Sequence, residues 1–159
     1  MKKITLIIIL ITTTLSLFAQ TQDSKGIQKV TFGAVYAVSA NTVLEKEIKP
    51  FTLGHNLSLN LCVVTRKTYH NFLYGFGNNA VRMVNGYLFK KDLGLYTIFS
   101  ENLGSRGSYV SVGVEQVVKA GDINFFLFAE VGTKINPVTK LVTLGFHANI
   151  QKPLWRRNK

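Results

Sequence analysis

The stretch "FTLGHNLSLNLCVV", residues Phe51 to Val64, alternates apolar and polar side chains. Its apolar residues fall on odd positions, interrupted only by His55, while small polar residues fall on even positions from Thr52 to Asn60. This is the period of a β-strand, in which successive side chains point to opposite faces of the sheet. The stretch therefore predicts a strand with one apolar and one polar face, and the apolar face must meet either a protein core or lipid.

Seven further segments show the same alternation and occupy most of the chain after residue 28. β-Branched and aromatic residues are abundant in them, and the helical period fits none of them as well. The segment Leu93–Glu101 is apolar on both faces, so the pattern does not determine its register. The eight predicted strands are Lys29–Ala40, Phe51–Val64, Thr68–Phe76, Ala80–Phe89, Leu93–Glu101, Ser108–Val118, Ile123–Thr133 and Leu141–Gln151.

The first residues have the features of a secretory signal peptide. Lys2 and Lys3 precede an apolar run that ends at Leu17, and the small residue Ala19 follows. The run is short and rich in threonine, which favours a cleaved signal over a membrane-spanning helix. The predicted division is a signal peptide 1–19, a polar leader 20–28, a β-barrel 29–151 and a basic tail 152–159.

The connectors between the segments predict an up-and-down order of strands. Arg66–Lys67, Lys90–Asp92 and Lys119–Gly121 are tight and basic, whereas the alternate connectors are longer, apart from Gly77–Asn79. In a meander alternate connectors lie at the same end, and short turns at one end are typical of outer-membrane barrels. The single cysteine, Cys62, provides no disulfide framework, so stability is expected from packing or from closure of the sheet.

Strand length and charge distribution favour lipid as the partner of the apolar faces. A spanning strand needs about 9–11 residues, and a closed sheet leaves no backbone group unpaired in lipid. A soluble periplasmic β domain that binds an apolar ligand is the alternative, but it should carry charged residues along its strands, and here they cluster at turns. The predicted fold is all-β, an eight-stranded antiparallel up-and-down transmembrane β-barrel, expected as a monomer in the outer membrane of a Gram-negative cell.

The chain resembles the small OmpA/OmpX-type outer-membrane barrels in three features. These are the signal peptide, the eight alternating segments and the alternation of short and longer connectors. The resemblance is architectural and covers about residues 28–151. It implies a packed lumen and a structural or interaction role at the cell envelope. Such barrels often end on an aromatic residue, but this chain continues as "KPLWRRNK", where Pro153 is expected to break the strand and Trp155 to lie at the membrane interface.

The polar faces predict which ionisable side chains point into the lumen. An unpaired buried charge is costly, so these side chains are expected to form a paired, structural cluster. The functional alternative is an ion gate or a blocked pore, and the structural role is favoured over it because an eight-stranded lumen is too narrow for an open channel. The predicted lumen polar cluster is Arg82, Glu115, Glu130 and His147.

A lipid-modifying enzyme is the alternative to a structural role. An acyl hydrolase could use Ser111, His147 and Glu115, which share the polar faces, but no local motif supports this trio. His55 and His70 interrupt apolar rows and are expected at the membrane interface, since neither has a carboxylate or cysteine at metal-ligand spacing. The sequence therefore assigns no catalytic residue, no metal ligand and no cofactor.

The chain is strongly basic, with 19 Lys and Arg against 8 Asp and Glu and a formal net charge of +11. An exported chain without a stacking motif is poorly suited to nucleic acid. Outer-membrane lipid, anionic headgroups and acidic periplasmic polymers are the expected partners, and a merely solvated edge is the alternative. The predicted basic rim, at the end that holds both termini, is Arg66, Lys67, Lys90, Lys91, Lys119, Arg156 and Arg157.

Overall fold

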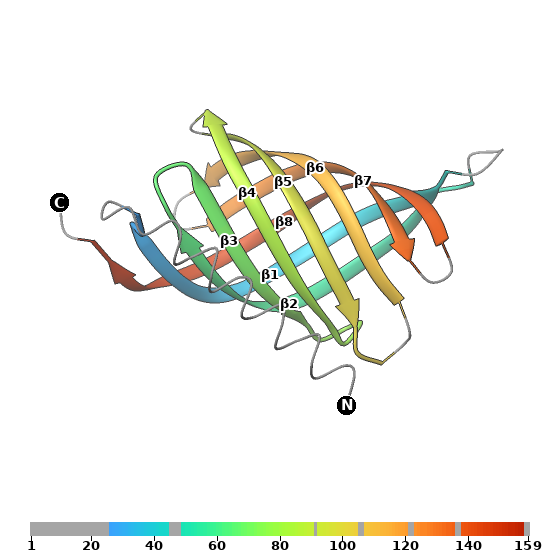
Figure 1. Ribbon diagram of the computed structural model, residues 1–159, viewed down its shortest axis with the longest axis horizontal. Helices are drawn as coiled ribbons and strands as arrows, with labels where there is room; N and C mark the ends of the chain where they lie inside the picture. The colour runs from blue at the N-terminus through green and yellow to red at the C-terminus, as the bar shows by residue number, and fades with distance from the viewer. Residues whose placement is uncertain are drawn as a thin grey trace.

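A computed structural model describes residues 26–44, 49–90, 92–104, 107–120, 123–135 and 138–157. The predicted signal peptide and most of the polar leader lie outside these residues. Eight antiparallel strands form a closed barrel in which each strand pairs with its neighbours in sequence and β1 pairs with β8 (Figure 1). The strands are β1 (Lys29–Val43), β2 (Thr52–Val64), β3 (Thr68–Gly75), β4 (Ala80–Lys90), β5 (Leu93–Asn102), β6 (Gly107–Ala120), β7 (Ile123–Ile135) and β8 (Val138–Arg156).

The closed, eight-stranded, up-and-down barrel predicted from the alternation is therefore confirmed. The largest difference from the predicted bounds is in β8, which is longer at both ends. Pairing of Ile135 with Val138 reduces the expected loop 134–140 to residues 136–137. Longer loops at one end were expected, but only the β1–β2 connection is long.

The expectation that Pro153 ends the last strand is wrong. Pro153 lies opposite Thr31, beside a register shift between Val30 and Thr31, and β8 continues to Arg156. Proline lacks an N–H group, and the irregularity in the ladder removes the need for one. Trp155 is thereby held opposite Val30 within the sheet.

The register of β5, which the sequence left open, follows from its partners on both sides. Tyr96 lies opposite Gly86 of β4 and Gly113 of β6, and all three point into the lumen. Leu95 lies opposite Tyr87 on the outer surface. Two neighbouring strands therefore decide a register that the sequence of β5 leaves ambiguous.

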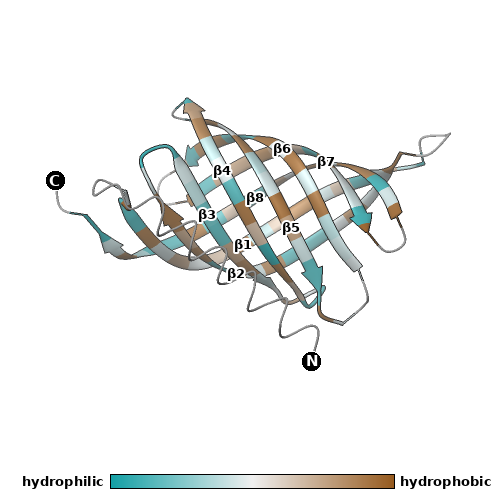
Figure 2. Cartoon of the chain, viewed as in Figure 1, coloured by the Kyte–Doolittle hydropathy of each residue, from teal (hydrophilic) through white to brown (hydrophobic). Residues whose placement is uncertain are grey.

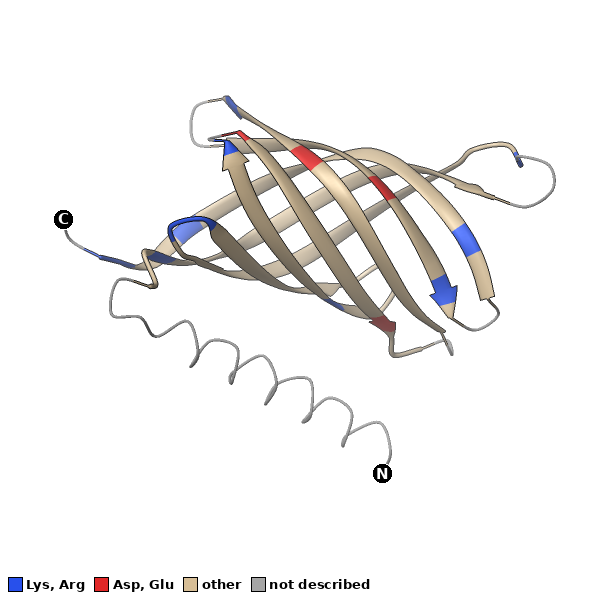
Figure 3. Ribbon diagram, turned by 45° about the horizontal axis from the view of Figure 1, so that its top comes forward, with Lys and Arg blue, Asp and Glu red and all other residues tan. Residues whose placement is uncertain are grey.

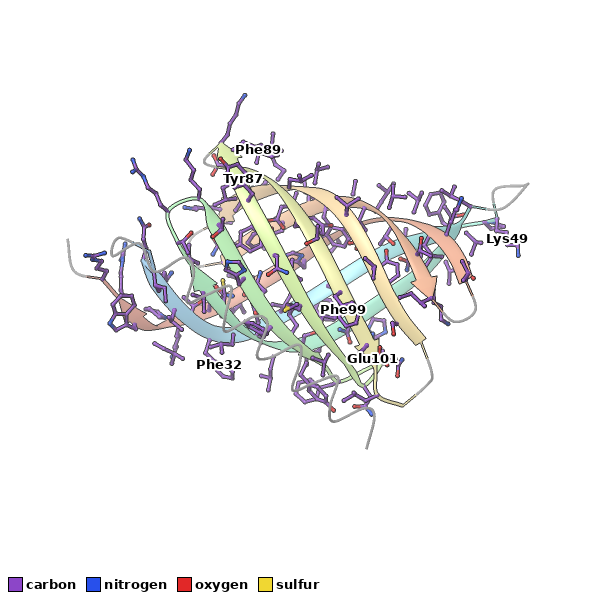
Figure 4. The ribbon with its side chains drawn as sticks, in the orientation of Figure 1. Phe32, Lys49, Tyr87, Phe89, Phe99 and Glu101 are labelled. Atoms are coloured by element: carbon purple, nitrogen blue, oxygen red, sulfur yellow. The ribbon has the colours of Figure 1, made fainter. Side chains whose placement is uncertain are left out.

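The outer surface is apolar on every strand. Phe32 of β1 and both Tyr87 and Phe89 of β4 lie on this surface (Figure 4). The leucines of the opening stretch do so as well, and apolar residues recur along each ribbon (Figure 2). The side chains buried inside are mainly polar, for example Thr31 and Asn60. This distribution is the inverse of that in a water-soluble domain.

Two glycines let tyrosine rings pack inside the lumen. A Cβ at Gly86 would lie 1.9 Å from the ring of Tyr69, and one at Gly113 would lie 2.5 Å from the ring of Tyr96. Each of these rings therefore lies flat across the neighbouring strand, where only glycine leaves room. This placement carries the phenolic hydroxyls towards the centre of the barrel.

Candidate functional site

Two buried carboxylates in the lumen are bonded by tyrosine and serine hydroxyls. The Tyr69 hydroxyl donates to Glu115 Oε1 at 2.5 Å. Glu130 accepts hydrogen bonds from Tyr96 at 3.1 Å and from Tyr109 at 3.0 Å. The exposed fractions of Glu115 and Glu130 are 5% and 8%, so these hydroxyls replace the water that both carboxylates lost on folding.

All four residues of the predicted lumen polar cluster line one interior cavity. Arg82 lies on the lumen face opposite Ser100 and is close enough to Glu130 for their charges to interact. His147 stacks on the ring of Phe126, with centroids 4.4 Å apart. The structure therefore brings Arg82 near Glu130 and stacks His147 on an aromatic ring.

Sequence reasoning missed two of the tyrosines that hold the carboxylates, Tyr69 and Tyr96. Tyr69 falls on the polar face of its predicted strand, so its parity was a usable signal. Tyr96 lies in the segment whose register was open, and its partner Glu130 lies two strands further along the chain. That partner is not visible from a local pattern.

The cavity occupies one half of the lumen and has a volume of about 690 Å³. It lies at the end of the β1–β2, β3–β4, β5–β6 and β7–β8 connections, where Asn41, Thr52 and Asn102 line it. Tyr69 and Phe126 lie towards the other end, where β1 begins and β8 ends, and there Thr31 donates to Gln151 at 2.8 Å. The expectation of a lumen packed throughout is thus corrected: a cavity remains in the half of the lumen away from the start of β1 and the end of β8.

The wall of the cavity contains buried acceptor groups. The side-chain oxygens of Asn56, Asn60 and Asn149 are buried, and no donor among the described residues reaches them. Asn60 is 1% exposed and Asn149 is 5% exposed. Because these oxygens are buried in the wall, they do not face a solute in the cavity.

The trio considered for an acyl hydrolase is not joined by hydrogen bonds. The Ser111 hydroxyl donates to Glu130 at 3.4 Å, whereas Glu115 accepts from Tyr69. His147 packs against Phe126. All three side chains face the lumen, so no lipid in contact with the outer surface can reach them.

The basic rim is present among the described residues at the end of the barrel that holds the C-terminus (Figure 3). Asp92 is the one acidic residue that the described ranges place there. Lys91 lies outside the described residues. The exposed members are Arg66, Lys67, Lys90, Lys119, Arg156 and Arg157.

The described residues contain no helix that is long and apolar enough to cross a membrane. They also contain no group of three or more His, Cys, Asp or Glu side chains arranged to hold a metal ion.

The fold defines this chain as a closed, eight-stranded antiparallel β-barrel with a polar interior and an apolar exterior. No protein-family model matches the chain, and no curated protein or solved structure matches it significantly.

Proposed function

We propose that this chain is an exported outer-membrane β-barrel with a structural or interaction role at the cell envelope. One observation carries the proposal: large apolar side chains are exposed on all eight strands, while the buried side chains are mainly polar. Soluble monomers rarely expose continuous apolar surface on this scale, because exposing it to water is unfavourable. Lipid removes that penalty without any change in the fold.

Strand length and closure support the same proposal. Every described strand except β3 has ten or more residues, enough for a tilted strand to cross the hydrocarbon layer. The pairing of β1 with β8 leaves no open sheet edge, which lipid would not tolerate.

The basic rim orients the barrel in this proposal. Its exposed cations lie at the end where β1 begins, β8 ends and the turns are shorter, and short turns are a feature of the periplasmic end of outer-membrane barrels. Each lysine or arginine near an anionic membrane surface contributes about 1 kcal/mol. The rim therefore favours anionic headgroups of the inner leaflet as its partners.

Fractionation of cells that express the full chain tests the proposal. We expect the protein in the outer membrane, extracted only by detergent, with faster gel migration before heating than after. Recovery in the aqueous periplasmic fraction, with migration that does not depend on heating, would overturn it.

A further inference from the structure

A hydrogen-bonded row of three polar side chains crosses the outer surface of β3 and β4. Thr68 and His70 are two residues apart on β3, so they share a face, and His70 lies directly opposite Asn85. Thr68 Oγ1 lies 3.4 Å from His70 Nε2, and His70 Nδ1 lies 2.8 Å from Asn85 Oδ1. Tyr69, between Thr68 and His70, points into the lumen, so the row faces outward.

The contact with Asn85 assigns a proton to His70 Nδ1, because Asn85 Oδ1 can only accept. In the neutral imidazole, Nε2 is then an acceptor facing the Thr68 hydroxyl. The Thr65 hydroxyl lies 2.7 Å from that of Thr68 and also 3.3 Å from the Thr68 carbonyl oxygen. When Thr65 donates to the Thr68 hydroxyl, the proton of that hydroxyl is available to His70 Nε2, 3.4 Å away.

This is the arrangement of a hydroxyl nucleophile, a general base and a residue that orients the base. The contact of 3.4 Å is long for a hydrogen bond, as nucleophile–base pairs often are before substrate binds. Such a constellation is recognised by geometry and roles, independently of the order of its members in the chain.

We propose that Thr68 and His70, positioned by Asn85, cleave acyl esters of anionic glycerophospholipids on the outside of the barrel. The substrate assignment rests on the proposed membrane location. It also rests on the two exposed cations of the basic rim that directly precede Thr68, Arg66 and Lys67.

Apolar side chains cover the surface around the row. Val63 lies opposite His70 on β2, and Tyr87 lies opposite Thr68 on β4. Phe72 and Met83 form the next outward pair on β3 and β4. A lipid phosphate at the basic turn would leave its acyl chains along this apolar wall, with the ester carbonyl beside Thr68.

The proposed reaction uses only lipid and water. Thr68 Oγ1 attacks the ester carbonyl carbon while His70 Nε2 takes the hydroxyl proton. The bond from the carbonyl carbon to the glycerol oxygen breaks, and His70 returns the proton to that oxygen, which releases a lysophospholipid. Water, with His70 again as base, then cleaves the acyl–Thr68 ester, releases a fatty acid and restores the hydroxyl.

The test uses the full mature chain inserted into vesicles of phosphatidylethanolamine and phosphatidylglycerol. Lysophospholipid and fatty acid are quantified by mass spectrometry, and insertion is checked by flotation and heat-dependent gel migration. We expect release by the unmodified chain, and a loss of about 100-fold or more for Thr68→Ala and for His70→Gln. Thr68→Ser should retain activity.

Matched variants separate catalysis from structure. His55→Gln changes the outward histidine of β2, and Thr97→Val removes a hydroxyl from the residue opposite Asn85; both should leave release unchanged. Asn85→Ala should lower release, and Asn85→Asp should restore it, because a carboxylate oxygen accepts the same Nδ1 proton. A merely structural role of Asn85 would not produce this rescue.

Two outcomes would overturn the catalytic proposal: no lysophospholipid from inserted protein, or release that survives Thr68→Ala. Failure of the chain to insert would instead overturn the proposed function. In that case the same variants are assayed in detergent with p-nitrophenyl butyrate. Hydrolysis that depends on Thr68 and His70 would then support the site, and its absence would reject it.

Discussion

Replacing Leu59 with arginine tests whether the outer surface meets lipid. Leu59 lies near the middle of β2 (Thr52–Val64), points outward between Ala34 of β1 and Tyr74 of β3, and is 39% exposed. Arginine on the lipid face of a barrel costs about 2–4 kcal/mol at the bilayer midplane. That cost lowers the equilibrium constant for the inserted, folded state by about 30- to 1,000-fold.

Leu53→Arg is the matched control on the same strand and face. Leu53 lies near the start of β2 and is 79% exposed. At about 3.3 Å per residue and a tilt of about 45°, it lies about 14 Å from the depth of Leu59. Arginine near the membrane interface costs about 0–1 kcal/mol, so this variant should insert almost normally.

Reversible unfolding from vesicles in guanidinium chloride, followed by heat-dependent gel migration, measures both costs. We expect Leu59→Arg to lose at least about 1 kcal/mol more than Leu53→Arg. Exposed substitutions on a water-soluble domain fall within about 0.5 kcal/mol of neutral. Equal, near-zero costs for the two variants would therefore refute the placement of this surface in lipid.

Three further predictions concern the interior and the rim. Gly86→Ala should destabilise the folded chain by about 1–3 kcal/mol in the same unfolding assay, because the new Cβ would lie 1.9 Å from the Tyr69 ring. Gly54→Ala, whose Cβ would lie 3.7 Å from its nearest neighbours, should leave the free energy of unfolding unchanged. Equal losses for the two variants would mean that the Tyr69 ring does not require glycine at position 86. Tyr96→Phe should cost about 1–3 kcal/mol, since it removes a hydrogen bond to a buried carboxylate, and an unchanged unfolding midpoint would count against that bond. Arg156→Ser should reduce by about 1 kcal/mol the extra stability in vesicles containing phosphatidylglycerol over purely zwitterionic ones, and no change would mean that the rim does not contact headgroups.

Much of the barrel could be predicted because alternation is a local property. The leucines of β2 lie outside, as their parity requires, and so do four valines of β6, Val110, Val112, Val114 and Val118. The register of β5 could not be predicted, because Leu95 and Tyr96 are both apolar enough to lie on either face. Contact between Tyr96 and Gly113 decides it, and that contact depends on another strand.

The sites depended still more on pairing between strands. Parity placed Glu115 in the lumen, but its partner Tyr69 is 46 residues away and comes from β3. His70 was expected only to lie at an interface. Its role in the proposed ester-cleaving site depends on the β3–β4 register, which sets it opposite Asn85.

The seam between β1 and β8 has a consequence for the order of folding. The first strand of the chain pairs with the last along the full length of β1, from Lys29 to Val43. Seven hairpin pairings are local in sequence, but the cylinder cannot close until the final strand has arrived. Any chain that stops before β8 keeps two open sheet edges, each a template for pairing with another chain. Closure of this barrel therefore requires the complete set of strands, because every shorter chain keeps both edges open.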